Sequence, residues 1–138
     1  KVDTIALNEF FIGQSKSYHS ARYIIILDGK KERQKSSGVL VTTPAGSYAW
    51  SKSSYNKILQ LDSKDFQFVV REPYEGKVFK NYKLKQGILN KNQKVKIISE
   101  MLDCILVADS VSKEYKLKPG DKATMSISNK NLKVAWGK

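Results

Sequence analysis

The sequence has one cysteine, one histidine and no long apolar run among its 138 residues. Because Cys104 has no partner cysteine, an internal disulfide framework is excluded. Because His19 is the only histidine, a zinc site of the ordinary cysteine and histidine kind is excluded as well. A helix that spans a bilayer needs about 18 or more apolar residues in a row, and no stretch approaches that length. We therefore expect no disulfide, no metal site and no membrane segment.

Acidic side chains are scarce, with 13 Asp and Glu against 25 Lys and Arg, and the formal net charge is +12. Such a charge attracts polyanions, which include nucleic acid, acidic lipid and phosphorylated small molecules, and it does not choose among them. The basic residues are scattered, as on a solvated surface. Residues 1–4 contain neither an apolar signal core nor an Arg-rich leader. This favours a cytoplasmic location, with the mitochondrial matrix as the alternative.

The length predicts one domain, and short β-branched runs predict that it is all-β. Two turns are recognisable: Asp28-Gly29, a dipeptide that accepts positive φ in a tight hairpin, and the turn from Lys118 to Asp121. We expect an antiparallel, two-layer, β-sandwich-like domain, and between Ala123 and Ser128 the alternation indicates that one sheet face meets solvent. The expected strands are Ile5 to Ile12, Arg22 to Leu27, Val39 to Thr43, Phe66 to Val70, Val95 to Ser99, Cys104 to Ala108, Lys113 to Leu117, Ala123 to Ser128 and Asn131 to Trp136.

One short helix is expected, beginning at Gly46-Ser47, with Ser47 as its cap and residues 48–54 as its body. It follows a strand and a Pro-Xaa-Gly turn. A strand, a turn and a helix start in this order aim backbone N–H groups at an anion, so residues 42–47 are a candidate ligand loop. The alternative is an ordinary strand-to-helix turn with Trp50 in the core.

A polar pair, Asn8-Glu9, interrupts an apolar run that resumes at Phe10. Buried polar groups are costly unless their hydrogen bonds are met, so this pair binds either neighbouring backbone or a ligand. His19 is expected in a solvated loop, and Cys104 is expected to be a small core residue. Neither supports a catalytic role.

The order of these motifs resembles the carboxy-terminal half of NAD kinases. Ala6-Leu7-Asn8-Glu9, a hairpin, and then the segment from Ser36 to Ser51 with Thr43-Pro44-Ala45-Gly46-Ser47 match the family's Asn-Glu motif and its Gly-rich Thr-Pro-Xaa-Gly-Ser motif. The specific part of the match is Ala6 to Ser54. The resemblance implies that residues 1–138 form the NAD-binding domain of an enzyme that phosphorylates the 2′-hydroxyl of the adenosine ribose of NAD and so makes NADP.

The resemblance also implies a set of NAD-binding residues, which are Asn8, Glu9, Thr43, Gly46, Ser47, Tyr48, Ala49, Trp50 and Ser53. In the family an aspartate commonly stands at the position of Ser37 and makes a contact between subunits, which implies a homo-oligomer with Ser37 at the interface. Many members have tyrosine in place of Trp50. With Ser37 and Trp50 the two motifs look more like the mitochondrial branch of the family.

The family's Gly-Gly-Asp-Gly motif, which supplies the catalytic aspartate in a preceding α/β domain, has no counterpart in this sequence. The resemblance therefore implies no catalytic residue in this chain, an inactive isolated chain, and a longer enzyme that uses NAD together with ATP and magnesium. Polyphosphate is the alternative donor.

Two other functions compete with the NAD kinase interpretation. The first is the β-domain of a related lipid kinase of the diacylglycerol or sphingosine type. The second is a non-catalytic basic domain that binds nucleic acid through exposed aromatic side chains. The aromatic residues considered for that role are Tyr18, Tyr23, Tyr74 and Tyr82.

Overall fold

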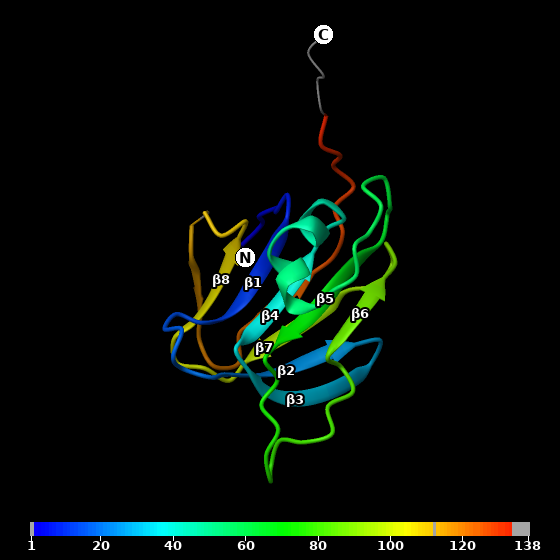
Figure 1. The fold of residues 1–138 in the computed structure, drawn as a ribbon. Coiled ribbons are helices and arrows are strands. Elements are labelled where there is room, and N and C mark those ends of the chain that lie inside the picture. The colour runs from blue at the N-terminus through cyan, green and yellow to red at the C-terminus, as the bar shows by residue number, and fades with distance from the viewer. Residues whose placement is uncertain (1, 112, 134–138) are drawn as a thin grey trace.

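The computed structural model describes residues 2–111 and 113–133, and these form ten strands and two short 3-10 helices (Figure 1). The strands are β1 (Glu9–Gln14), β2 (Ala21–Leu27), β3 (Lys30–Ser36), β4 (Gly38–Thr42), β5 (Phe66–Arg71), β6 (Gln86–Leu89), β7 (Val95–Ser99), β8 (Cys104–Ala108), β9 (Tyr115–Leu117) and β10 (Lys122–Met125), and the 3-10 helices are η1 (Ala45–Tyr48) and η2 (Trp50–Ser54).

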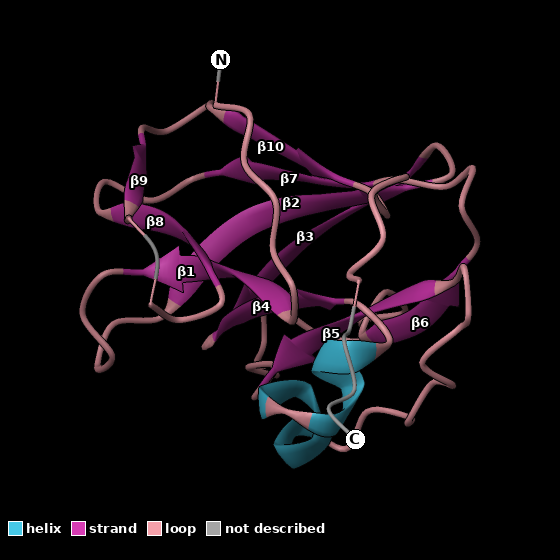
Figure 2. Cartoon of the chain, turned by 90° about the horizontal axis from the view of Figure 1, so that it is seen from above, coloured by secondary structure: helices cyan, strands magenta, loops and turns pink. Residues whose placement is uncertain are grey.

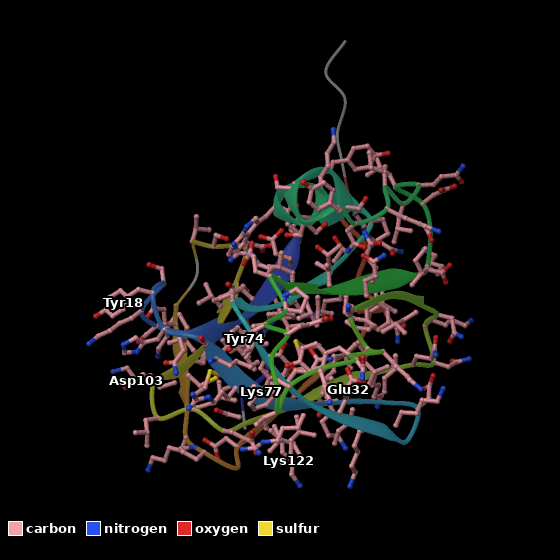
Figure 3. The ribbon with its side chains drawn as sticks, turned by 60° about the horizontal axis from the view of Figure 1, so that its bottom comes forward. Tyr18, Glu32, Tyr74, Lys77, Asp103 and Lys122 are labelled. Carbon is pink, nitrogen blue, oxygen red and sulfur yellow. The ribbon has the colours of Figure 1, made fainter. Side chains whose placement is uncertain are left out.

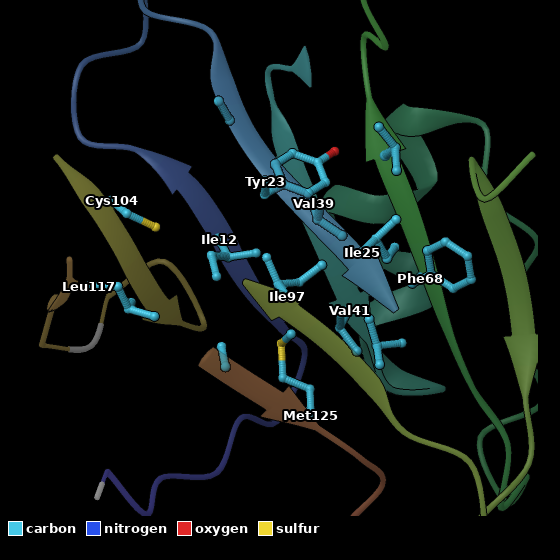
Figure 4. Close-up of a cluster of buried hydrophobic side chains, with 14 of the residues drawn as sticks. Ile12, Tyr23, Ile25, Val39, Val41, Phe68, Ile97, Cys104, Leu117 and Met125 are labelled. Carbon is cyan, nitrogen blue, oxygen red and sulfur yellow. The ribbon is translucent and has the colours of Figure 1, made fainter. Parts of the chain in front are cut away.

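The strands form two antiparallel sheets that face each other (Figure 2). The six-stranded sheet has the order β6-β5-β4-β1-β8-β9, and the four-stranded sheet has the order β10-β7-β2-β3. The expected all-β, two-layer architecture is therefore confirmed. The core lies between the sheets, and Figure 4 shows side chains from both layers meeting there, among them Ile12, Val41 and Phe68 from the first sheet and Tyr23, Ile97 and Met125 from the second.

The hairpin between β2 and β3 turns at Asp28 and Gly29, whose φ angles are 49° and 77° as expected. Its second strand was not expected, because the segment from Lys30 to Lys35 is polar throughout and resembles a loop. The segment does alternate, however, since Gln34 is buried and Arg33 is exposed. Its inner face is polar, and the buried hydroxyl group of Tyr23 bonds to Gln34. The strand β6 also has no counterpart among the expected strands.

The expected helix is replaced by η1 and η2, which lie on the outer side of the six-stranded sheet (Figure 2). Pro44 stands at the cap position of η1, and no side chain caps the helix. The role expected for Ser47 as a helix cap was therefore wrong, because its side chain points inward. The N–H of Gly46 donates to the Thr43 hydroxyl group, and that of Ser47 donates to the carbonyls of Thr43 and Pro44, so both are used within the turn.

Several strand ends differ from the expected ones. The first strand begins at Glu9 rather than Ile5, and β10 ends at Met125 rather than Ser128. In β10, Ala123 is buried and Thr124 is exposed, which confirms that one face of the sheet meets solvent. Of the strand expected from Asn131 to Trp136, residues 131–133 are not in a strand and the rest lie outside the described residues.

Candidate functional site

The start of β1 and the turn after β4 lie side by side, because antiparallel pairing places Glu9 opposite Thr42. The carbonyl oxygen of Asn8 accepts a hydrogen bond from the backbone N–H of Thr43 at 2.9 Å. Gly46 approaches the same carbonyl so closely that a Cβ at position 46 would lie 2.0 Å from the Asn8 oxygen. The fold thus joins the two motifs that the sequence places 35 residues apart, and the junction requires glycine.

The hydroxyl group of Thr43 ties the turn together. It lies 2.5 Å from the carbonyl oxygen of Leu7 and 3.2 Å from that of Asn8, and it accepts the N–H of Gly46 at 3.1 Å. Thr43 therefore acts on the backbone of both motifs, and its side chain holds the turn against the entry to β1.

Ser47 and Ser51 support the turn from within. Ser47 is fully buried; its hydroxyl group donates to the carbonyl of Pro44 at 2.6 Å and accepts the N–H of Leu59 at 2.9 Å. The hydroxyl group of Ser51 donates to the carbonyl of Gly46 at 3.1 Å. Both hydroxyl groups are engaged with backbone, so these two serines fix the shape of the loop.

Asn8 and Glu9 keep polar atoms without partners. Within the described residues, the side-chain amide of Asn8 has no hydrogen-bond partner, although its backbone is fully engaged. Glu9 is only 4% exposed, and its Oε2 atom has no partner among the described residues. Burial first, and then the charge of Asp109, raise the pKa of the Glu9 carboxyl group, while a hydrogen bond from Ser110 opposes them. Unpaired groups of this kind are what a polar ligand would satisfy.

Asp109, which follows β8 directly, was missed by the sequence analysis. Its carboxylate accepts the backbone N–H groups of Leu7 and Asn8 at 2.8 and 2.6 Å, and that of Glu9 at 3.3 Å. It adopts the left-handed conformation, with a φ of 53°. Asp-Ser after an apolar strand is the only local signal for it, and nothing in that dipeptide points to residues 100 positions earlier.

Trp50 lies on the outer side of the six-stranded sheet, half-buried. Its ring is 5.3 Å from that of Phe11, between centroids, and the guanidinium group of Arg71 lies 4.8 Å from the indole centroid. Tyr48 and Ser53 are exposed beside it. The indole therefore has partners of its own and remains partly open.

Two expected site residues occupy other surroundings. Ala49 joins the two 3-10 helices and is exposed. Ser37 lies between β3 and β4, at the opposite end of β4 from Thr42, where its N–H donates to the carbonyl of Arg71 at 2.9 Å. Within one chain, Ser37 is thus separated from the Asn8 and Gly46 junction by the length of β4.

A cavity of about 210 Å³ borders the junction on one side. Thr43 and Leu7 line it from the motif side, Phe10 and Phe66 form an apolar wall, and Ile127 faces them from the segment after β10. Of the expected NAD contacts, only Thr43 is among the described residues that line it. The cavity therefore neighbours the predicted site and does not coincide with it.

Two of the four aromatic residues considered for nucleic-acid binding are buried. Tyr23 and Tyr82 are 0% and 7% exposed, so the expectation that they form an exposed surface was wrong. Their burial follows from the polar inner face of β3, where the Tyr23 hydroxyl group meets Gln34 and the Tyr82 hydroxyl group accepts the N–H of Lys35. Tyr18 and Tyr74, both labelled in Figure 3, are exposed and border the same hollow in the surface.

The remaining residues singled out from sequence behave as expected. His19 is exposed in the loop before β2, and Cys104 is fully buried. In residues 2–111 and 113–133, no group of three or more His, Cys, Asp and Glu side chains is arranged to hold a metal ion. No helix in these same ranges is long and apolar enough to cross a bilayer.

Comparison with known proteins gives partial matches in sequence and a nearly complete match in fold. No protein-family model matches the chain. Human "NAD kinase 2, mitochondrial" is 53% identical over 47 residues, which are 33% of this chain and 11% of the human protein. The NAD kinase of Brucella suis is 41% identical over 64 residues, which are 45% of this chain and 24% of that protein. The matched segments therefore span between a tenth and a quarter of these relatives.

Two solved structures share the fold. An NAD kinase from Archaeoglobus fulgidus in complex with ATP aligns with a TM-score of 0.73 at 22% identity, over 90% of this chain and 46% of that one. Yeast NADH kinase complexed with NADH aligns with a TM-score of 0.71 at 23% identity, over 86% of this chain and 33% of that one. The two-layer fold is thus shared with these kinases, and the curated relatives together with the structural neighbours support a relationship of this chain with the NAD kinase family.

Proposed function

We propose that this chain is the NAD-binding domain of an NAD kinase. The observation that carries the proposal is the junction at which the Asn8 carbonyl meets Thr43 and Gly46. This junction places the free amide of Asn8 and the unpaired carboxylate oxygen of Glu9 where β1 begins and β4 ends. The similarity to NAD kinases supports the assignment of NAD as the ligand.

The side chains at the junction suit the polar parts of a dinucleotide. A carboxamide offers both donors and acceptors, so Asn8 can hydrogen-bond to a base edge or a ribose, and the carboxylate of Glu9 can accept from ribose hydroxyl groups. The exposed Tyr48 and Ser53 and the half-buried Trp50 would line the rest of the pocket, with the indole against a base. These groups bind and orient the acceptor.

The proposed reaction is transfer of a phosphoryl group to the 2′-hydroxyl of the adenosine ribose of NAD, which yields NADP. Such transfer depends mainly on positioning and on neutralisation of charge, and this domain contributes the positioning of the acceptor. When bound, ATP would supply the phosphoryl group and magnesium would neutralise its charge. We place the catalytic base and the donor site outside these 138 residues, in a preceding domain of a longer enzyme.

Three finer features belong to the same proposal. The motifs around Ser37 and Trp50 favour the mitochondrial-type branch, and the 53% identity to human NAD kinase 2 supports it. The proposed compartment is the cytoplasm, and the mitochondrial matrix is the alternative that this branch would favour. We also propose a homo-oligomer in which Ser37, remote from the junction within one chain, faces the site of a second subunit.

The test is a calorimetric titration of the chain with NAD. Saturable binding is expected, and Asn8→Ala should weaken it by about tenfold, the effect of losing a well-placed hydrogen bond. The matched control is Asn92→Ala, which removes an exposed asparagine from the turn between β6 and β7. A wild-type chain that does not bind NAD, or equal binding by both variants, would contradict the proposal.

A second measurement addresses catalysis. A coupled assay for NADP with ATP and magnesium is expected to show no turnover by the isolated chain. Clear turnover would show that catalytic groups lie within these residues and would refute the proposed division between domains.

A further inference from the structure

We propose that Asp109 is the positioning residue that holds Asn8 and Glu9 in the orientation that binds the dinucleotide, an inference that rests on the proposed function. Asp109 is 100 residues away from Glu9 in sequence and belongs to neither of the motifs that resemble the kinase family. Its role follows from the contacts of its carboxylate, which are directed at backbone and not toward a ligand.

The carboxylate of Asp109 receives three consecutive backbone N–H groups. Its Oδ2 atom accepts from Leu7 at 2.8 Å, and its Oδ1 atom accepts from Asn8 at 2.6 Å and from Glu9 at 3.3 Å. In an extended strand successive N–H groups point to opposite sides, so three that converge on one side chain require a bend. Residues 7 and 8 form that bend just before β1 begins. Asp109 therefore imposes the local shape from which the polar pair projects.

The opposite side of the same segment is held by Thr43. Its hydroxyl group contacts the carbonyl oxygen of Leu7, and its N–H donates to that of Asn8. The N–H of Asp109 in turn donates to the carbonyl of Glu9 at 2.9 Å. The backbone of Asn8 is thus occupied on both its N–H and its carbonyl, and its side-chain amide is left as the polar group that can turn to a ligand.

The position of Asp109 itself is fixed by the sheet. Pairing of β1 with β8 places Phe10 opposite Ala108, and Asp109 follows with a positive φ of 53°. Aspartate tolerates this conformation better than most side chains do. Its charge also adds to burial in raising the pKa of the Glu9 carboxyl group, which couples Asp109 to the second member of the pair. One carboxylate thereby acts on both residues of the proposed site.

The experiment is a double-mutant cycle on NAD binding by the chain. Asp109→Asn keeps the size of the side chain but turns an N–H donor toward the backbone N–H groups. We expect it to weaken NAD binding by about tenfold, which corresponds to about 1.4 kcal/mol. In the Asn8→Ala background the same substitution should cost less, about threefold, because Glu9 is then the only residue of the pair left for Asp109 to position.

The matched control is Asp121→Asn. Asp121 precedes β10 in the other sheet, and its carboxylate accepts a single backbone N–H, that of Lys118, at 2.7 Å. This variant should bind NAD as the wild type does. Unfolding temperatures are measured for all variants, and affinities are corrected for the folded fraction. A purely structural Asp109 would lower the unfolding temperature and leave the corrected affinity unchanged.

The outcomes separate the two proposals. If the wild-type chain binds NAD and Asp109→Asn binds it equally well, or if the effects of the Asp109 and Asn8 substitutions simply add, the positioning role is overturned while the proposed function stands. If the wild-type chain does not bind NAD, the proposed function fails and the positioning role fails with it.

Discussion

Replacing Gly46 with alanine places a methyl group at the junction that carries the proposed site. The new Cβ would lie 2.0 Å from the carbonyl oxygen of Asn8 and 2.5 Å from its carbonyl carbon. Both atoms are backbone, so no flexible side chain can move aside. The turn after β4 must therefore shift by more than about 1 Å to reach an ordinary van der Waals contact of about 3.5 Å.

Such a shift breaks the hydrogen bond from Thr43 to Asn8, which is 2.9 Å long, and strains that from Gly46 to Thr43. Each lost hydrogen bond costs about 1 kcal/mol, and overpacking adds about 1 to 3 kcal/mol. We therefore expect Gly46→Ala to lower the free energy of unfolding by about 2 to 4 kcal/mol. The apparent affinity for NAD should fall in proportion to the fraction of the chain that remains folded.

The measurement is urea denaturation followed by circular dichroism, with Gly87→Ala as the matched control. A Cβ at position 87 would meet only the ring of Phe68, at 3.0 Å, and a small shift of that ring relieves the contact. Gly87→Ala should lower the free energy of unfolding by less than about 1.5 kcal/mol. If Gly46→Ala is as stable as the control and binds NAD normally, the close contact of the two motifs does not define the site.

Three further predictions use the same chain. Because the pKa of Glu9 is raised in the folded chain, its ionised form disfavours the fold. The stability of Glu9→Gln relative to the wild type should therefore increase as pH rises from the ordinary carboxyl pKa through the raised one, and the two should converge at lower pH. Urea denaturation at several pH values checks this. Cys104, buried and with a raised pKa, should react with a thiol reagent only on unfolding, as followed by absorbance. Trp50→Ala should weaken NAD binding by about 1 to 3 kcal/mol in calorimetry.

The sequence predicts the all-β architecture because most core strands are short runs of β-branched and other apolar residues. It does not predict β3, since the inner face of that strand is formed by polar residues such as Gln34, whose burial depends on the Tyr23 hydroxyl group. Hydrophobic periodicity cannot detect a strand whose buried side chains satisfy one another through hydrogen bonds.

The candidate site is likewise only partly readable from sequence. Local motifs identify Asn8, Glu9 and the Thr43 to Gly46 turn, and the fold does bring them together. The short helix expected after that turn is formed as the two 3-10 helices, but the cap expected at Ser47 was wrong, because Ser47 bonds to Pro44 and Leu59 inside the molecule. Asp109 could not be found at all, since its contacts arise from the pairing of β1 with β8 and cross 100 residues of sequence.

The most direct test of the central claim is to map NAD on the chain by amide NMR shifts during titration. The account predicts that the largest shifts fall together on residues 7–9 and 43–50, with the side-chain amide of Asn8 among them. It also predicts that the exposed loop of Tyr18 and His19, at the other end of the sheet, stays unchanged. Shifts confined to that loop, or to the basic outer face of β3, would show that the junction of Asn8 with Gly46 is not the NAD site.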